Sequence, residues 1–204
     1  MILAIDTANT PVSVCLTEPD GRLLTEAVFA AHTQPAATLF PVIGRLLDEA
    51  GASLADVTRL AVCHGPGSFT GIRIGLAAVA GLRLILPLPV FTVSTLEAYA
   101  AAANAPVRVR VSDGAGGWVE QDFAADGSAL SPIQPVTDPA ALPPEGFLEG
   151  GPGWGMAPEP LARHLAVAAA RRPDTAAPDA LIPLYLRPSY AEVAASLRAS
   201  DHPG

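Results

Sequence analysis

Lysine is absent from the sequence, and all 12 of its basic residues are arginine. The lysine amine forms Schiff bases, acts as a general base and binds phosphate in P-loops. Mechanisms that depend on a lysine are therefore excluded for this chain. The absence of lysine thus excludes Schiff-base enzymes, enzymes with a lysine general base and P-loop nucleotide-binding proteins.

Potential metal ligands are scarce as well. The two cysteines, Cys15 and Cys63, lie far apart within apolar runs, so we expect two small buried residues and not a disulfide or a metal pair. The four histidines show no i, i+4 spacing and no HExxH motif. They are His32, His64, His164 and His202. We therefore expect no metal site.

Long apolar runs and basic clusters are also missing. The longest apolar run, 74–82, is much shorter than the roughly 20 residues of a membrane-spanning helix. The first apolar run is interrupted at Asp6, too early for a signal peptide, so we expect a cytoplasmic protein without membrane contact. With a net charge of −8 and arginine pairs only at 108/110 and 171/172, the isolated chain is not expected to bind tRNA.

The order of elements in the first half predicts an α/β fold. Half of the 204 residues are hydrophobic, which is enough for a sizeable core. Turn residues separate three consecutive strands, and helices then alternate with strands. The expected strands are 1–7, 12–17, 22–29, 59–63 and 90–93, and the expected helices are 38–50, 70–84 and 94–103. This order is typical of a ribonuclease H-like (actin-like ATPase) half domain with a mixed sheet and flanking helices.

The second half of the sequence predicts a reduced half domain. A boundary near residue 104 divides the chain into 1–104 and 105–204. Twelve of the 21 prolines lie between Pro132 and Pro188, which predicts many loops. The expected strands are a hairpin of 107–111 with 118–123 and a candidate strand within 130–136. A helix is expected over 159–170, followed by a short helix and tail after Ala191. The last helix is expected to pack back on the first half domain.

The helix predicted over 70–84 carries small residues on one face. Each glycine inside a helix costs about 1 kcal/mol relative to alanine, so a compensating contact is expected. One interpretation is a partner interface and the other is packing within the chain; we favour the interface. Its predicted residues are Gly71, Ile72, Gly75, Ala78, Val79 and Leu82, with helix 38–50 beside them.

Three turns are candidates for nucleotide binding, with ATP or ADP as the ligand. Actin-like ATPases place a carboxylate and a glycine-containing phosphate turn after the first strand, but here Ala8, Asn9, Thr10 and Pro11 follow that position. The alternative for each turn is an ordinary connection between elements. The candidate nucleotide-binding residues are Asp6, Thr7, Asp113, Gly114, Gly151 and Gly153.

Ser68 follows His64 by four residues, which suggests a hydrolase. The nucleophile-elbow motif G-x-S-x-G is not present, however, because Pro66 and Phe69-Thr70 occupy the wrong positions. We instead expect Ser68 or Thr70 to cap the following helix. No residue is assigned a catalytic role.

Four segments resemble the TsaB (YeaZ) family. They are ILAIDTA at 2–8, GPGSFTGIRIG at 65–75, VSTLEAYA at 93–100 and PLYLRP at 183–188. The resemblance implies an actin-like fold and a non-catalytic subunit that binds and supports TsaD. In that family TsaD transfers a threonylcarbamoyl group to N6 of adenosine 37 in tRNA. The resemblance also implies a heterodimer with TsaD, and a homodimer when the chain is alone. It further implies a larger complex with a TsaE-like ATPase, and contact with tRNA only through the complex.

One segment departs from the family pattern. The family has Asp-Ala-Arg where this chain has Asp113, Gly114 and Ala115. TsaD carries a paired-histidine metal motif that this sequence lacks, which favours a non-catalytic paralogue. The alternative from another class is an ATP-dependent phosphotransferase of the actin-like superfamily. It requires a working phosphate turn at Asp6 and a cleft between the half domains.

Overall fold

The computed structural model describes residues 1–30, 35–103, 105–113, 116–138, 140–152, 160–173 and 179–186. Its first sheet has five strands in the order β3-β2-β1-β4-β5. These strands are β1 (Ile2–Asp6), β2 (Val12–Thr17), β3 (Leu23–Phe29), β4 (Arg59–Cys63) and β5 (Val90–Val93). β1 lies at the centre, antiparallel to β2 and parallel to β4, so the sheet is mixed as predicted.

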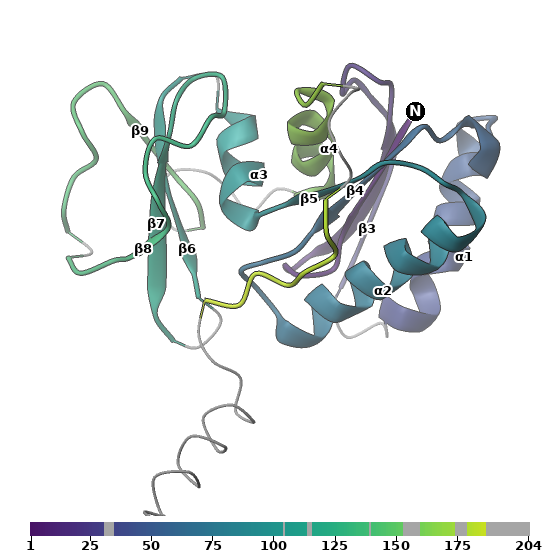
Figure 1. The fold of residues 1–204 in the computed structure, drawn as a ribbon, viewed down its shortest axis with the longest axis horizontal. Helices are drawn as coiled ribbons and strands as arrows, with labels where there is room; N and C mark the ends of the chain where they lie inside the picture. Colours follow the sequence, from purple (N-terminus) through teal and green to yellow (C-terminus); the bar gives the residue numbers. More distant parts are fainter. Residues whose placement is uncertain are drawn as a thin grey trace, which may run out of the picture.

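Helices cover both faces of this sheet (Figure 1). α1 (Pro35–Glu49) and α2 (Phe69–Ile85) lie on one face. α4 (Ala162–Ala170) packs against β1, β2 and β4 on the other face and also contacts α3 (Thr95–Ala102). All residues of β1, β2, β4 and β5 are buried, as expected for strands covered on both sides.

Residues typical of helix ends mark two of these helices. Ser94 and Glu97 form a capping box at the start of α3, with Ser94 Oγ accepting from Glu97 N at 3.0 Å. Gly51, two residues after α1, has φ of +63°, a conformation that glycine adopts without the steric cost of a side chain. The short η1 (Leu54–Asp56) then leads into β4.

The second sheet has four strands in the order β8-β7-β6-β9. β6 (Val107–Ser112) and β7 (Trp118–Phe123) form the predicted hairpin. The candidate strand within 130–136 is reduced to β8 (Gln134–Pro135), because Pro135 cannot donate a ladder hydrogen bond. β9 (Leu148–Gly150), parallel to β6, was not predicted. Two mixed sheets with flanking helices form the ribonuclease H-like (actin-like) α/β fold.

A segment that follows α4 in the sequence contacts the first sheet again. Residues 179–186 extend from the start of β5, where Asp179 N donates to Val90 O, to the end of β4, where Leu184 N donates to His64 O, both at 2.8 Å. We call residues 179–186 the strap. Within the described ranges, no helix combines the length and apolarity that crossing a bilayer requires. The division at residue 104 stays a prediction.

Several predicted features fall outside the described residues. They are Gly114, Gly153, His32, His202, the start of the helix predicted from Glu159, the end of the PLYLRP segment at Arg187 and Pro188, and the helix after Ala191.

Candidate functional site

The turn before α2 has a structural role at both of its polar residues. Ser68 is the N-cap of α2, and its hydroxyl accepts a hydrogen bond from Gly71 N at 3.2 Å. His64 Nδ1 lies 3.1 Å from the backbone oxygen of Ile182 in the strap. The prediction that Ser68 caps the helix is confirmed.

The glycines of α2 approach the chain's own first strand. A Cβ on Gly71 would lie 1.9 Å from Thr7 O, and a Cβ on Gly75 would lie 2.7 Å from Thr7 Oγ1. Of the two interpretations, packing within the chain therefore accounts for these two glycines. They admit the turn that follows β1.

The six residues predicted for a partner interface are all buried within this chain. Among the four that are not glycine, Ala78 is the most exposed, with 7% of its surface accessible. Their small or apolar side chains are thus explained by packing of α2 on the first sheet. A partner surface on this half of the chain stays a prediction, and the exposed neighbours of these residues are its strongest candidates.

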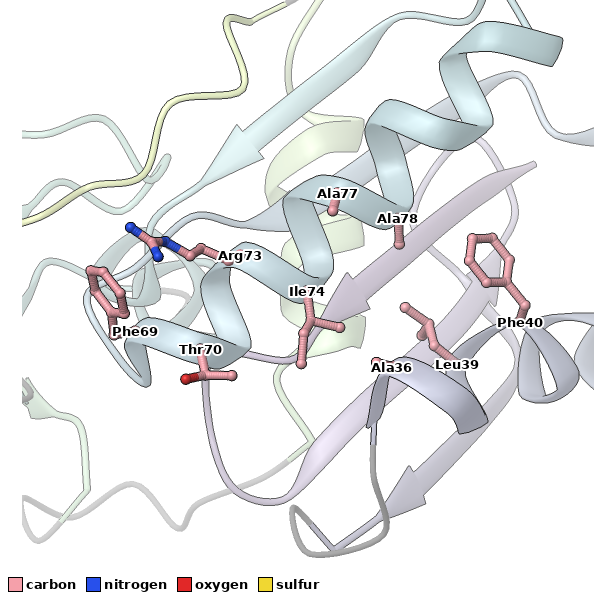
Figure 2. A pocket seen from close by; sticks show the side chains of 9 residues that line it. All are labelled: Ala36, Leu39, Phe40, Phe69, Thr70, Arg73, Ile74, Ala77 and Ala78. Atoms are coloured by element: carbon pink, nitrogen blue, oxygen red, sulfur yellow. The ribbon is translucent and has the colours of Figure 1, made fainter.

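An apolar groove of about 470 Å³ lies between α1 and α2 (Figure 2). Its largest side chains are unusually exposed for phenylalanine: Phe40 shows 50% of its surface and Phe69 shows 42%. The groove is lined by Ala36, Leu39, Phe40, Phe69, Thr70, Arg73, Ile74, Ala77 and Ala78. We call these nine residues the α1/α2 groove.

Two further glycines extend the exposed stripe of each helix. Gly44 follows Phe40 by one turn, and Gly81 follows Ala77 by one turn, so each shares the face of its groove neighbour. A Cβ on either glycine would meet no atom within 4 Å. Packing inside the described chain therefore gives no reason for glycine at these positions.

One end of the groove is built from two distant segments. The Phe69 ring stacks on Tyr185 of the strap, with ring centroids 4.9 Å apart. The Arg73 guanidinium lies 3.9 Å from the centre of the Phe69 ring, and Arg73 Nε donates to the Tyr185 hydroxyl at 3.1 Å. The strap thus reaches the edge of the groove.

Asp6 organises the point where three strand ends meet. Its Oδ1 accepts hydrogen bonds from Ala8 N at 2.9 Å and from Asn9 N at 3.2 Å. The Asn9 amide also reaches Cys63 and Thr95, and the Thr95 hydroxyl donates to Pro66 O at 2.6 Å. This network joins the ends of β1 and β4 to the start of α3.

The second oxygen of Asp6 is enclosed and lacks a partner among the described residues. Asp6 is fully buried, and within the described ranges its Oδ2 accepts no hydrogen bond. Burial raises the pKa of this carboxyl to about 6, and the bonds from Asn9 and Ala8 oppose the rise. Burial likewise raises the pKa of the neighbouring Cys63 thiol, so the reactive thiolate is disfavoured.

A pocket of about 270 Å³ lies beside this network, at the carboxyl ends of the strands. The nucleotide candidates Asp6, Thr7, Asp113 and Gly151 do not line it, although their neighbours do. Its lining is Ala8, Asn9, Thr10, Pro66, Gly67, Ser68, Thr95, Val111, Ser112 and Pro152. Within the described residues this lining contains no charged side chain, and no cluster of three or more potential metal ligands occurs.

The described candidates for nucleotide binding have other contacts. The Thr7 hydroxyl donates to Gly71 O at 2.6 Å, and Asp113 Oδ1 accepts from Gly117 N at 2.9 Å. Gly151 has φ of +116°, and a Cβ there would lie 2.0 Å from Arg110 O, so glycine allows close approach to β6. Nucleotide binding stays a prediction.

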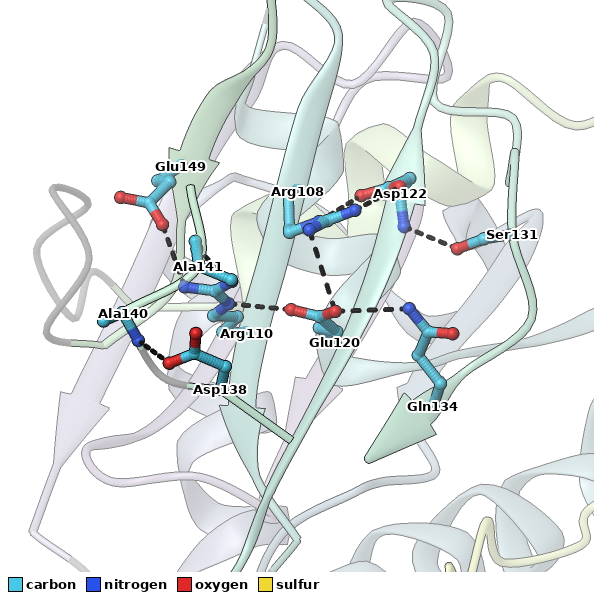
Figure 3. Close-up of polar contacts among 10 residues, drawn as sticks. All are labelled: Arg108, Arg110, Glu120, Asp122, Ser131, Gln134, Asp138, Ala140, Ala141 and Glu149. Atoms are coloured by element: carbon cyan, nitrogen blue, oxygen red, sulfur yellow. Dashed lines mark hydrogen bonds and ion pairs between the residues drawn. The ribbon is translucent and has the colours of Figure 1, made fainter. Parts of the chain in front are cut away.

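The arginine pair of the second sheet belongs to a charge network (Figure 3). Arg108 pairs with Asp122 at 2.7 Å, and Arg110 pairs with Glu120 at 2.8 Å and with Glu149 at 3.0 Å. The Arg110 side chain is only 1% exposed. These two arginines therefore form ion pairs with carboxylates of their own sheet.

Known proteins match both the sequence and the fold. The chain is 43% identical over 104 residues to the tRNA threonylcarbamoyladenosine biosynthesis protein TsaB of Escherichia coli, and 33% identical over 100 residues to that of Bacillus subtilis. The solved structure of YeaZ from Pseudomonas aeruginosa matches with a TM-score of 0.71 at 27% identity. That match covers 91% of this chain and 99% of the other. This chain is therefore similar to the TsaB (YeaZ) family in sequence over its first half and in fold over most of its length.

The sequence matches are confined to part of each protein. They cover 50% and 49% of this chain and 43% of each curated relative, so the matched region is less than half of those relatives. A family model described as TsaD, tRNA N6-adenosine threonylcarbamoyltransferase, also matches residues 29–118. That range includes all of α1 and α2.

Sequence reasoning missed the exposed residues of the α1/α2 groove. The predicted site residues did not include Phe40, Phe69, Arg73 or Ile74, because the spacing of the glycines indicates only the buried face of α2. Phe40 and Phe69 carried a usable signal, since each is a large aromatic residue on a helix position that faces away from the sheet. Nothing in the sequence indicates that Tyr185 contacts Phe69.

Proposed function

We propose that this chain is a non-catalytic subunit of tRNA threonylcarbamoyladenosine biosynthesis that binds a TsaD-type paralogue through the α1/α2 groove. The observation that carries the proposal is the groove itself, with Phe40 and Phe69 exposed along it. Exposed aromatic side chains beside an apolar hollow are the usual anchors of a protein interface. By this proposal the chain acts in the cytoplasm.

Gly44 and Gly81 support close helix contact at the same surface. Each has open space above its Cα, although glycine in a helix costs about 1 kcal/mol relative to alanine. A partner helix that approaches along this stripe would compensate for that cost. The groove and the two glycines together favour a contact that runs along both helices.

The family model supports a paralogue as the partner. A TsaD protein resembles this chain over 29–118, so we expect it to present a similar pair of helices. Two similar faces can pack around an approximate twofold axis, as identical faces do in a homodimer. The proposal therefore includes a heterodimer with TsaD, a homodimer when TsaD is absent, and a TsaE-like ATPase and tRNA that join through the complex.

Non-catalytic status is supported by the pocket of about 270 Å³ beside Asp6, at the carboxyl ends of the strands. No charged group among the described residues lines it, and the carboxylate nearest the phosphate-turn position, Asp6, is enclosed and bonded to its own turn. The alternative, an ATP-dependent phosphotransferase, is favoured only by the position of that pocket between the halves. ATP turnover near the usual enzymatic rate of about 1 per second, lost in Asp6→Ala, would support this alternative.

The test is binding to purified TsaD from the same organism, followed by isothermal titration calorimetry. Wild-type protein should bind, and Phe40→Asp should abolish binding because it places a charge in the apolar groove. Leu142→Asp is the matched control, since Leu142 is 82% exposed and lies outside the groove. A wild-type chain that does not bind TsaD, or a Phe40→Asp variant that binds normally, would contradict the proposal.

Activity provides a second readout. Modification of tRNA by TsaD and the remaining purified components should require the wild-type chain and should be lost with Phe40→Asp. Full activity without the chain would show that it does not serve this pathway.

A further inference from the structure

Arg73 is the single charged residue among the nine that line the groove. It lies at the end marked by Phe69 (Figure 2), with its guanidinium over the ring. Within the described part of the chain, Arg73 forms no ion pair with a carboxylate, whereas Arg108 and Arg110 are both paired. A positive charge therefore lies at the edge of an apolar surface without a carboxylate from the described part of its own chain.

The guanidinium is held before any partner arrives. Phe69 supports it from one side through a cation–π contact, and Tyr185 accepts the hydrogen bond from Nε. A free arginine side chain loses rotamer entropy when it binds, so a guanidinium that is already fixed binds at a lower entropic cost. The bond to Tyr185 uses one of five N–H donors, and the remaining donors suit a bidentate contact with a carboxylate.

We propose that Arg73, positioned by Tyr185, recognises a carboxylate of the TsaD-type partner and so selects that partner over a second copy of this chain. This inference rests on the proposed function. Among the described residues, the groove lining contains no Asp or Glu, so two copies packed groove to groove would offer Arg73 no acid from that described lining. A partner with an acidic residue at this position gains a paired charge that self-association lacks. Charge complementarity of this kind decides partner choice more than total buried area does.

The experiment measures two equilibria for each variant: binding to purified TsaD by calorimetry, and self-association by sedimentation. Arg73→Met keeps the side-chain stem over Phe69 and removes the charge. It should weaken TsaD binding by about 30-fold or more, the usual loss for one partner of a desolvated charge pair. Self-association should change less than about threefold, a difference that lies within the scatter of a surface substitution.

Arg83→Glu is the matched control, because Arg83 is an exposed arginine on the same helix outside the groove lining. It should leave both equilibria nearly unchanged. Arg73→Lys should bind TsaD better than Arg73→Met, and raising the salt concentration should weaken wild-type binding more than Arg73→Met binding. Tyr185→Phe should give a smaller loss, because it removes only the hydrogen bond that positions Arg73.

The outcomes separate this inference from the proposed function. If wild-type protein binds TsaD, Phe40→Asp abolishes binding and Arg73→Met binds normally, the groove is the interface and the role of Arg73 is wrong. If Arg73→Met weakens self-association as much as TsaD binding, Arg73 acts through packing, and the selection of a partner by charge is overturned. If wild-type protein does not bind TsaD, both proposals fail together.

Discussion

Gly71 lies so close to Thr7 that a Cβ on the glycine would be 1.9 Å from the threonine's backbone oxygen. The Thr7 hydroxyl donates to Gly71 O at 2.6 Å, so the two residues are also joined by a buried hydrogen bond. The start of α2 is therefore fixed to the turn after β1. This contact places α2 on the sheet with its other face exposed beside α1.

Gly71→Ala should strongly destabilise the protein. The added methyl group overlaps the backbone of the β1 turn, which cannot move without breaking the Thr7 bond, and overpacking of this kind typically costs about 1–3 kcal/mol or more. Gly81→Ala is the control, because its Cβ would meet open space and alanine favours a helix by about 1 kcal/mol. Urea unfolding measures both. Equal stability of Gly71→Ala and wild type would show that the close approach is wrong.

Gly75→Leu and Gly81→Leu should have opposite effects on folding and association. Leucine at 75 would overlap Thr7 Oγ1 and Val62, so the melting temperature should fall. Leucine at 81 should leave the melting temperature near that of wild type but weaken TsaD binding, because it fills the space that a partner helix would occupy. Thermal melting and calorimetry separate the two effects. Normal TsaD binding by Gly81→Leu would exclude that turn of α2 from the interface.

Asp6 should make stability fall as the pH rises from 4 to 6. Burial raises its pKa from the ordinary 3.8 to about 6, so the folded state favours the protonated form. That stabilisation is complete below about pH 4 and is lost as the pH rises through 6, by at most about 3 kcal/mol. Asp6→Asn stays neutral and keeps an oxygen for Ala8 N. It should match wild type at pH 4 and exceed it at pH 8 in urea unfolding; an identical pH profile would contradict the raised pKa.

The first sheet could be predicted because its residues carry local signals. Turn residues separate its opening strands, and the capping box of Ser94 and Glu97 marks the start of α3. β9 could not be predicted, because three residues next to a glycine-rich loop have no periodicity of their own. Its pairing with β6 depends on Gly151, where close backbone approach decides the geometry.

The candidate site was predicted only in its general position. Glycine spacing correctly indicated that something lies close to α2, but spacing cannot tell whether the neighbour is Thr7 of the same chain or a partner. The contact of Tyr185 with Phe69 joins residues more than 100 positions apart, and no pattern in the sequence connects them. The same limit applies to Asp6, whose burial depends on how three strand ends meet.

Arg110 should be more important for stability than a surface arginine, because its side chain is 1% exposed and lies between Glu120 and Glu149. Arg110→Met should cost about 3 kcal/mol or more, since removing one member of a buried ion pair leaves the other charges without compensation. Arg22→Met is the control, because Arg22 is exposed and its pair with Glu18 should contribute less than about 1 kcal/mol.

A triple variant tests whether the loss at Arg110 comes from uncompensated charge. Arg110→Met combined with Glu120→Gln and Glu149→Gln removes the buried positive charge and both of its carboxylate partners. It should recover much of the stability lost by Arg110→Met, as measured by urea unfolding. A triple variant as unstable as Arg110→Met would instead attribute the loss to packing and to the hydrogen bond that Arg110 donates to Ala141 O at 2.7 Å. The charge network would then serve mainly to hold the loop before β9 against β6.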